Sequence, residues 1–333
     1  MSATRPLDSL IVLIPIYNDW EAVGTLIPKI DSQINGQIKK VSIVLINDGS
    51  EDRLAKDDSS LYNSYNSISQ IEVVHLKRNV GHQRAIAVGL AFVRNHYQEA
   101  GAIVVMDGDG QDSPLDLPRL VTDHCSHTED AIVFAKRGRR SESHLFKTLY
   151  WIFRLIHRLL TGRSVKVGNF SLIPFSLLER LVTLPELWSH VSATAFKYDL
   201  PVRYVEADRL ARIVGQSQMA LDSLILHGIK AFSVYYDRIA VRSLAGLGLA
   251  SVVCVFLLTV LGLISLYADT DFLTGIATLT FIFILFLLNT GAVVFFSLIN
   301  KLHHDNQRLS WPDRDYDNFI KMVETVNGNH DVD

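Results

Sequence analysis

The stretch Ala102–Pro114, AIVVMDGDGQDSP, joins a short apolar run to a dense acidic loop. The apolar part is rich in β-branched residues, which is typical of a strand buried on both faces of a sheet. The polar part then places three carboxylates, those of Asp107, Asp109 and Asp112, within six residues. A turn needs only one such side chain, and most acidic clusters are plain solvated loops. The surrounding sequence must therefore decide what this loop does.

Three more apolar runs end in polar loops. Leu10–Ile16 ends in YND, Val41–Ile46 ends in NDGSED, and Ile71–Leu76 ends in KRNVGHQ. Apolar residues at helical spacing follow in Asp19–Ile30 and Arg84–Val93. Strands that alternate with helices predict right-handed βαβ units and a parallel sheet covered on both faces. Because ligands bind at the carboxyl ends of such strands, we expect the four polar loops to line one crevice.

The composition bounds the function. The chain has 333 residues and a net charge of −3, so it holds one large or two modest domains and composition gives no support to nucleic-acid binding. Its two cysteines, Cys125 and Cys254, lie far apart, which argues against a disulfide framework or a zinc site.

Two segments near the C-terminus predict a membrane anchor. Ser243–Tyr267 and Phe272–Ile299 contain no charged residue over 25 and 28 residues, and about 20 are enough to span a bilayer. Only ADTD separates them, whereas basic residues flank the pair on the outside. The positive-inside rule then predicts a two-span hairpin in the cytoplasmic membrane, with the polar domain and both termini in the cytoplasm. The N-terminus lacks the pattern of a signal peptide.

A basic region precedes the hairpin. Lys136–Lys166 contains nine Lys or Arg residues and one acid, and Ser143–Gly162 has the spacing of an amphipathic helix. A core helix with a solvated stripe is the alternative, but beside a hairpin we expect a helix at the interface with membrane lipids. Gln216–Tyr236 is a second candidate, and a short helix is expected over Tyr316–Val326. The basic residues expected to meet an anionic lipid are Arg137, Arg139, Arg140, Lys147 and Arg154.

The acidic loop suits a hard divalent cation. Asp107, Asp109 and Gln111 alternate along what we expect to be an extended segment, so their side chains can point the same way. Three oxygen ligands leave the remaining shell open for a diphosphate, whose charge the ion would neutralise. The alternative is capping of a helix that begins near Pro114, which Asp112 or Ser113 is better placed to do.

The order of the motifs resembles the family-2 glycosyltransferases of the polyprenyl-phosphate type, which include dolichol-phosphate mannose synthases and undecaprenyl-phosphate sugar transferases. The resemblance covers residues 8–300 and rests on IPIYND, INDGSED, RNVGHQRAIAVGL, VVMDGDGQDSP, VGNFSLIP and the two spans. It implies an α/β GT-A fold with a mostly parallel, Rossmann-like sheet. It also implies a nucleotide-diphosphate sugar as donor, Mg²⁺ or Mn²⁺ as cofactor, polyprenyl phosphate as acceptor, and inversion of the anomeric centre.

The resemblance also implies roles for individual residues. The positions that match nucleotide-sugar contacts are Pro15, Tyr17, Asp48, Gly81, Gln83 and Asp107. Asp107, Asp109 and Gln111 match the metal motif D-x-D-x-Q, and Arg212 matches a basic position near the phosphates. The candidates for a catalytic role are Asp109, Asn169 and Arg212.

One position departs from the pattern. Many relatives carry G-D-F where this chain has Gly168-Asn169-Phe170, and Asn169 cannot accept a proton. A phosphate monoester is already mostly ionised near neutral pH, with a second pKa of about 6, so it needs positioning rather than deprotonation. The asparagine therefore favours a phosphate acceptor, and we expect it to bind a sugar hydroxyl or a phosphate. Glu186 or His190 could contact the sugar, or simply begin a helix.

The resemblance leaves alternatives open. Another lipid or glycan could be the acceptor, and a membrane-tethered, non-catalytic sensor of sugar nucleotides is the alternative outside enzymes. A processive polysaccharide synthase would carry Q-x-x-R-W, which the sequence lacks. Small residues at Gly246, Gly248 and Ala250 could pack a homo-oligomer. The expected parts are a donor-binding core (1–140), an acceptor-side part (141–240), the spans (243–299) and a cytoplasmic tail (300–333).

Overall fold

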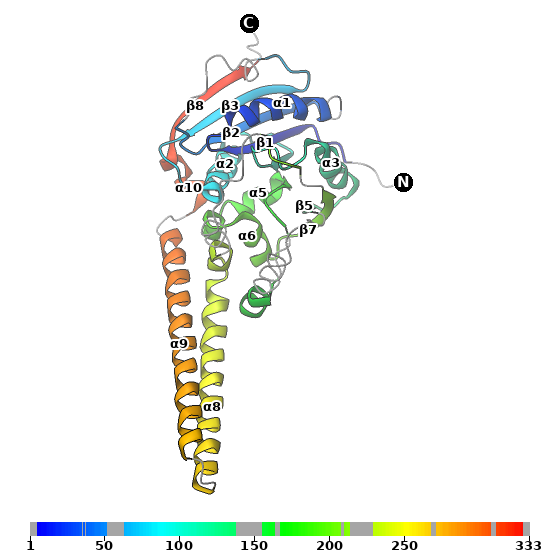
Figure 1. Cartoon of the computed structure of the whole chain (residues 1–333). Helices are drawn as coiled ribbons and strands as arrows, with labels where there is room; N and C mark the ends of the chain where they lie inside the picture. The colour runs from blue at the N-terminus through cyan, green and yellow to red at the C-terminus, as the bar shows by residue number, and fades with distance from the viewer. Residues whose placement is uncertain are drawn as a thin grey trace. The chain divides into compact units, whose positions relative to one another are not determined.

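The structure, a computed structural model, describes residues 5–34, 36, 38–51, 63–137, 155–163, 167–207, 210–213, 229–267, 271–307 and 311–328. The chain forms two compact units (Figure 1). The first comprises Met1–Glu142, Val165–Leu224 and Asn306–Asp333, and the second comprises Ser143–Ser164 and Ile225–Asp305.

An eight-stranded sheet forms the centre of the first unit. Its strands are β1 (Ser9–Ile16), β2 (Lys40–Asn47), β3 (Ile68–Leu76), β4 (Ala102–Val105), β5 (Ile132–Arg137), β6 (Ser171–Pro174), β7 (Val202–Ala207) and β8 (Ile320–Gly328). They follow the order β7-β5-β6-β4-β1-β2-β3-β8. Strands β1 to β4 pair in parallel, as do β5 and β7, whereas β6 and β8 run antiparallel to their neighbours. The predicted α/β fold with a mostly parallel sheet is confirmed.

Helices cover both faces of this sheet. They are α1 (Trp20–Ile34), α2 (His82–His96), α3 (Leu117–Ser126), α5 (Phe175–Leu181), α6 (Val191–Lys197) and α10 (Pro312–Asp315), with 3₁₀ turns η1 (Pro114–Asp116), η2 (Pro185–Trp188) and η3 (Tyr316–Phe319). Alternate residues of β1 enter two separate cores, because side chains of a strand point to opposite faces. One core contains α1 and α3, and the other contains α2, α5 and α6.

The end of the chain corrects one expectation. The short helix expected over Tyr316–Val326 is wrong: a 3₁₀ turn ends at Phe319, and β8 then pairs with β3 (Figure 1). The physical reason is that the edge of β3 offers unpaired backbone groups, and this pairing outweighs a weak local helix preference. Val323 lies opposite Val74, and Val326 packs on the core that contains α1.

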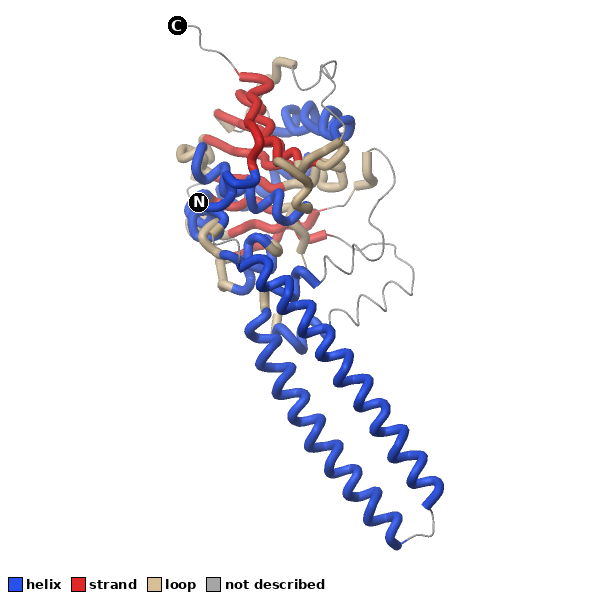
Figure 2. Tube along the Cα trace, turned by 90° about the vertical axis from the view of Figure 1, so that its left-hand side faces the viewer, coloured by secondary structure: helices blue, strands red, loops and turns tan. Residues whose placement is uncertain are grey.

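The second unit contains two long apolar helices, α8 (Tyr236–Tyr267) and α9 (Asp271–Gln307) (Figure 2). Their segments Tyr236–Ile264 and Gly275–Lys301 are long and apolar enough to cross a membrane, which agrees with the predicted spans. The ring of Tyr236 stacks on the rings of Phe296 and His303, with centroids 5.7 and 4.5 Å away.

The predicted amphipathic helices are only partly within the described residues. Residues 155–161 are helical and expose Leu155, Ile156 and Leu159, while Arg242 Nη1 donates to the Leu159 carbonyl at 2.9 Å. Residues 143–154 and 214–228 lie outside the described part of the chain.

Candidate active site

The polar loops meet at one edge of the sheet. In the parallel register Ile16 of β1 lies beside Asn47 of β2, and Leu13 of β1 lies beside Val105 of β4. The segments that begin at Tyr17, Asp48 and Met106 therefore leave the sheet on the same side. They meet at the carboxyl ends of the strands, the edge at which open α/β sheets bind ligands, and a crevice there remains a prediction.

Asp48 ties two of these loops together. Its buried carboxylate accepts hydrogen bonds from the backbone N–H groups of Val80 and Gly81, at 2.7 and 2.9 Å. Gly81 has a φ of +88° and is the residue before α2, so this contact fixes where that helix starts. The contact with a nucleoside remains a prediction, whereas the role in shaping the loop is directly visible.

The acidic loop turns instead of running extended. Gly108 and Asp109 form a turn, and Gly110 has a φ of +78°. Asp109 Oδ1 accepts from the Gln111 N–H at 2.9 Å, and Asp112 Oδ2 accepts from the Asp107 N–H at 2.9 Å. The extended segment we expected is therefore wrong, because aspartate side chains bond nearby backbone amides and stabilise a turn there.

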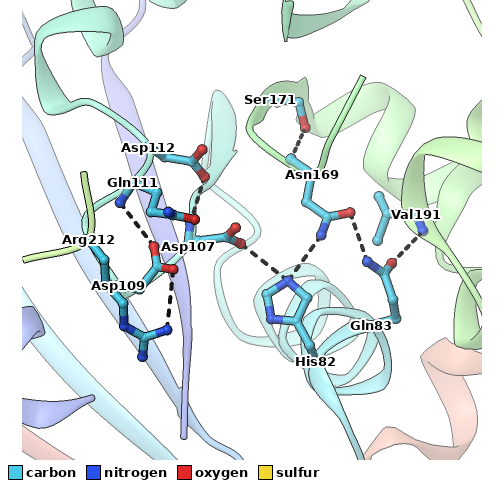
Figure 3. Close-up of polar contacts among 10 residues, drawn as sticks. All are labelled: His82, Gln83, Asp107, Asp109, Gln111, Asp112, Asn169, Ser171, Val191 and Arg212. Carbon is cyan, nitrogen blue, oxygen red and sulfur yellow. Dashed lines mark hydrogen bonds and ion pairs between the residues drawn. The ribbon is translucent and has the colours of Figure 1, made fainter. Parts of the chain in front are cut away.

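As a result the two carboxylates of the motif face different partners (Figure 3). Asp107 Oδ1 lies 3.2 Å from His82 Nε2, and Asp109 Oδ2 lies 3.8 Å from Arg212 Nη1. Ser113 accepts from the Leu115 N–H at 3.3 Å and caps η1, as expected from the sequence.

Arg212 is held against the acidic loop. Its guanidinium also bonds the Asp19 carboxylate, while the Ile213 N–H donates to the Asp109 carbonyl at 3.1 Å. The structure thus brings Arg212 and Asp109 together, although they are far apart in the sequence. Asp19 was missed by sequence reasoning, even though it belongs to the YND loop.

The pKa of Asp109 lies above its usual value. Burial has the largest effect, followed by a lowering from the Gln111 amide, a raising from Asp107 and a lowering from Arg212. A divalent cation would relieve the repulsion between Asp107 and Asp109, and carboxylate oxygens are ligands that hard cations prefer. In the described part of the chain no three His, Cys, Asp or Glu side chains form a complete metal cage. By the chemistry of their oxygen atoms, the carboxylates of Asp107 and Asp109 fit a hard divalent cation.

Opposite the acidic loop lies a hydrogen-bonded chain of three amide groups that ends in an imidazole, which we call the amide chain: Val191 N–H, Gln83, Asn169 and His82. Gln83 Oε1 accepts from the Val191 N–H at 3.1 Å, and Gln83 Nε2 donates to Asn169 Oδ1 at 3.0 Å. Asn169 Nδ2 lies 3.0 Å from His82 Nε2 (Figure 3). Both polar atoms of the Asn169 side chain are thus bonded within the protein.

His82 is the member of the amide chain that faces outward. Asn169 is 7% exposed, whereas the side chain of His82 is 42% exposed. Desolvation lowers the pKa of His82, but the carboxylates of Asp107, Asp112 and Asp109 raise it more, so the pKa lies above its usual value. Sequence reasoning missed His82, although the motif RNVGHQ contains it.

The remaining predicted residues divide into three groups. Pro15 is buried in β1, with its carbonyl close to Gly108, and Tyr17 is 43% exposed at the same edge. Arg137 ends β5, whereas Arg139, Arg140, Lys147 and Arg154 lie outside the described residues.

Of the two possible sugar contacts, His190 begins α6 and accepts from the Ala193 N–H at 3.5 Å. Glu186 accepts from Lys197 Nζ at 2.7 Å. These contacts favour the alternative in which the segment begins a helix.

Comparison with known proteins identifies the family. The model of the family described as glycosyl transferase family 2 matches residues 11–182, which is more than half of the chain. The chain belongs to glycosyl transferase family 2. This glycosyltransferase is 26% identical over 288 residues to an uncharacterised glycosyltransferase, YkcC, of Bacillus subtilis, with 83% of each chain covered.

Two further comparisons report one relative in sequence and one solved structure with a similar fold. It is 29% identical to the bactoprenol glucosyl transferase of Shigella phage SfV, over 68% of its own length and 73% of the relative. A solved structure described as a mycobacterial protein superposes with a TM-score of 0.50 at 15% identity, covering 70% of this chain and 75% of that one. The latter shows likeness of fold alone.

Proposed function

We propose that this glycosyltransferase moves a sugar from a nucleotide-diphosphate sugar to polyprenyl phosphate, with inversion, at the cytoplasmic face of a membrane. The observation that carries the proposal is the pairing of a two-carboxylate loop with a site that has an asparagine at position 169. The name of the phage relative, a bactoprenol glucosyl transferase, supports a polyprenyl acceptor. The two apolar helices support placement at a membrane.

The acidic loop would hold Mg²⁺ or Mn²⁺ through Asp107 and Asp109, with Gln111 as a further oxygen ligand. Such an ion neutralises the charge that develops on a departing diphosphate. Arg212 lies 3.8 Å from Asp109 and would add a second positive charge near the phosphates. Asp19 shares that guanidinium and keeps it pointed at the loop.

The acceptor side of the site contains no carboxylate at position 169. The Asn169 amide cannot take a proton, and its bonds to Gln83 and His82 hold it in place. An acceptor hydroxyl would have to lose a proton, but a phosphate monoester is already ionised near neutral pH. This contrast favours a phosphate acceptor.

The sheet itself supports a hairpin arrangement of the spans. Strand β3 precedes α8 in the chain, β8 follows α9, and the two strands are hydrogen-bonded to each other. Residues on both sides of the two apolar helices therefore belong to one folded unit, which requires an even number of crossings. Arg238, Arg242 and Lys301 flank the apolar segments, so the positive-inside rule supports a cytoplasmic location for this unit.

The test uses full-length protein in lipid nanodiscs with undecaprenyl phosphate, Mg²⁺ and a panel of radiolabelled nucleotide sugars. We expect label in the organic phase with one donor, and we expect EDTA to abolish it. Release of free nucleotide without lipid-soluble label would reject the polyprenyl acceptor. No consumption of any donor would favour the non-catalytic sensor.

A further inference from the structure

The hydrogen bonds of the amide chain have only one possible direction. The backbone N–H of Val191 can only donate, so the Gln83 atom 3.1 Å away must be the acceptor oxygen. Gln83 Nε2 then donates to Asn169 Oδ1, which leaves Asn169 Nδ2 as the donor that faces His82 Nε2 at 3.0 Å. A neutral His82 ring that accepts this hydrogen bond at Nε2 carries its single proton on Nδ1.

The other neighbour of His82, the Asp107 carboxylate, can only accept a hydrogen bond and therefore favours the protonated ring. Asp107 Oδ1 lies 3.2 Å from Nε2, and a protonated ring would donate to it from that atom. A protonated ring also carries a proton on Nδ1. Nδ1 is therefore a hydrogen-bond donor in the protonated ring and in the neutral ring that accepts from Asn169.

This donor is available to a ligand. Nδ1 lies on the side of the ring away from Asn169 (Figure 3), and the side chain is 42% exposed. Nδ1 has no hydrogen-bond partner in the described part of the chain. The amide chain thus presents a fixed N–H group beside the first carboxylate of the metal motif.

We propose that His82 Nδ1–H binds an ionised phosphate oxygen in the active site, and that Asn169 restricts the enzyme to acceptors that need no deprotonation. The inference rests on the proposed function. One oxygen of the acceptor phosphate forms the bond to the anomeric carbon while the bond from that carbon to the donor diphosphate breaks. The electron pair leaves with the nucleoside diphosphate, and no proton moves, because the attacking oxygen is already an anion.

An aspartate at position 169 would move the proton of the neutral His82 ring from Nδ1 to Nε2. A carboxylate can only accept, so His82 would donate to it from Nε2 and would present a lone pair at Nδ1. Such a ring could take a proton from an acceptor hydroxyl. Asn169 is therefore a positioning residue, and His82 is the group that touches the phosphate.

The first test reads the ring directly. Full-length protein labelled with ¹⁵N-histidine is placed in nanodiscs, and long-range ¹H–¹⁵N correlations report which nitrogen carries the proton. The His82 signal is identified by its loss in His82→Asn, and His127 on the exposed end of α3 provides an internal comparison. We expect Nδ1–H in the wild type and Nε2–H in Asn169→Asp. Nε2–H in the wild type would overturn the inference.

The second test follows binding and turnover. Inorganic phosphate should shift the Nδ1–H signal of the wild type, and the absence of a shift would overturn the inference even if no sugar is transferred. With polyprenyl phosphate we expect Asn169→Asp and His82→Phe to lose about tenfold to a hundredfold in kcat/KM, the loss typical of a hydrogen bond to a charged group. His82→Asn, which keeps an N–H near Nδ1, should lose less.

The kinetic constants then distinguish the source of the phosphate. A raised KM for polyprenyl phosphate with unchanged binding of the nucleoside diphosphate places the acceptor on Nδ1. Weakened binding of the nucleoside diphosphate instead places the departing diphosphate there. Unchanged kinetics in His82→Phe would overturn the inference. A wild type that makes no lipid-linked sugar would instead reject the proposed function, and the phosphate titration would then decide whether His82 Nδ1–H binds phosphate.

Discussion

The two sides of the active site are built on opposite principles. The acidic loop carries Asp107 and Asp109, and the charge of Asp107 contributes to the raised pKa of Asp109, whose largest cause is burial. The amide chain contains no carboxylate. Its buried member Gln83 accepts a hydrogen bond from the Val191 N–H and donates one to the buried Asn169. The acidic side therefore gains from a bound cation, whereas the neutral side is already complete within the protein.

This difference indicates that the acidic loop depends on a bound ligand more than the amide chain does. A cation and a diphosphate would change the electrostatics of the acidic loop strongly, because its charges are partly desolvated. The hydrogen bonds of the amide chain are already formed within the protein, so ligand binding does not have to create them. Such preorganisation favours catalysis. Changes on the acidic side should thus affect cation binding, and changes on the neutral side should affect turnover without affecting the cation.

The largest effect is expected at the acidic side. Asp109→Asn removes a charge from the proposed cation site, and we expect kcat to fall by about a thousandfold or more, since the proposed ion would stabilise the departing diphosphate. Mn²⁺ binding, followed by electron paramagnetic resonance, should weaken in parallel. Asp8→Asn is the matched control, because the side chain of Asp8 is 65% exposed and pairs with Lys39 at the surface. Retained activity in Asp109→Asn would remove the metal assignment.

A smaller effect is expected when the amide chain is cut. Gln83→Met keeps the volume but leaves the Val191 N–H and Asn169 Oδ1 without Gln83, at a cost of about 2 to 4 kcal/mol in the free energy of unfolding. Turnover should fall about tenfold, while Mn²⁺ binding should stay unchanged. Gln33→Met, on exposed α1 surface, is the control. Weakened Mn²⁺ binding in Gln83→Met would contradict the separation of the two sides.

The smallest effect concerns the backbone of the acidic loop. Gly110 has a φ of +78°, and an added Cβ would clash with Ile213, which lies beside Arg212. Gly36 has a φ of +75° with nothing within 4 Å of an added Cβ. Gly36→Ala should therefore cost only the backbone penalty of about 1 to 2 kcal/mol, whereas Gly110→Ala should also displace Arg212 and lower kcat severalfold. Equal activity of the two variants, measured beside chemical denaturation, would show that Ile213 does not position Arg212.

The sequence predicted the parts of the structure that depend on local pattern. Apolar runs mark β1 to β4 and the two apolar helices, and polar loops follow the ends of the strands. Long-range contacts were beyond it. The pairing of β8 with β3 depends on an open sheet edge, and the bond of Asn169 to His82 joins residues 87 positions apart.

The site shows the same division. The D-x-D-x-Q motif and Asn169 were visible as residue types, but their orientation was not. Asp109 bonds the Gln111 amide and so bends the loop, which separates two side chains that alternation would place on one side. The role proposed for His82 depends on its contacts with Asn169 and Asp107, which the sequence does not show.

The mass of the lipid product tests the central claim most directly. Wild-type protein is given one active donor and an equal mixture of polyprenyl phosphate and unphosphorylated polyprenol, and the lipid extract is analysed by mass spectrometry. The account predicts a single product, polyprenyl phosphate plus one sugar, and no glycosylated polyprenol. A glycosylated polyprenol formed at a comparable rate would contradict it, because that reaction requires a base that a site with Asn169 and an Nδ1-protonated His82 does not provide.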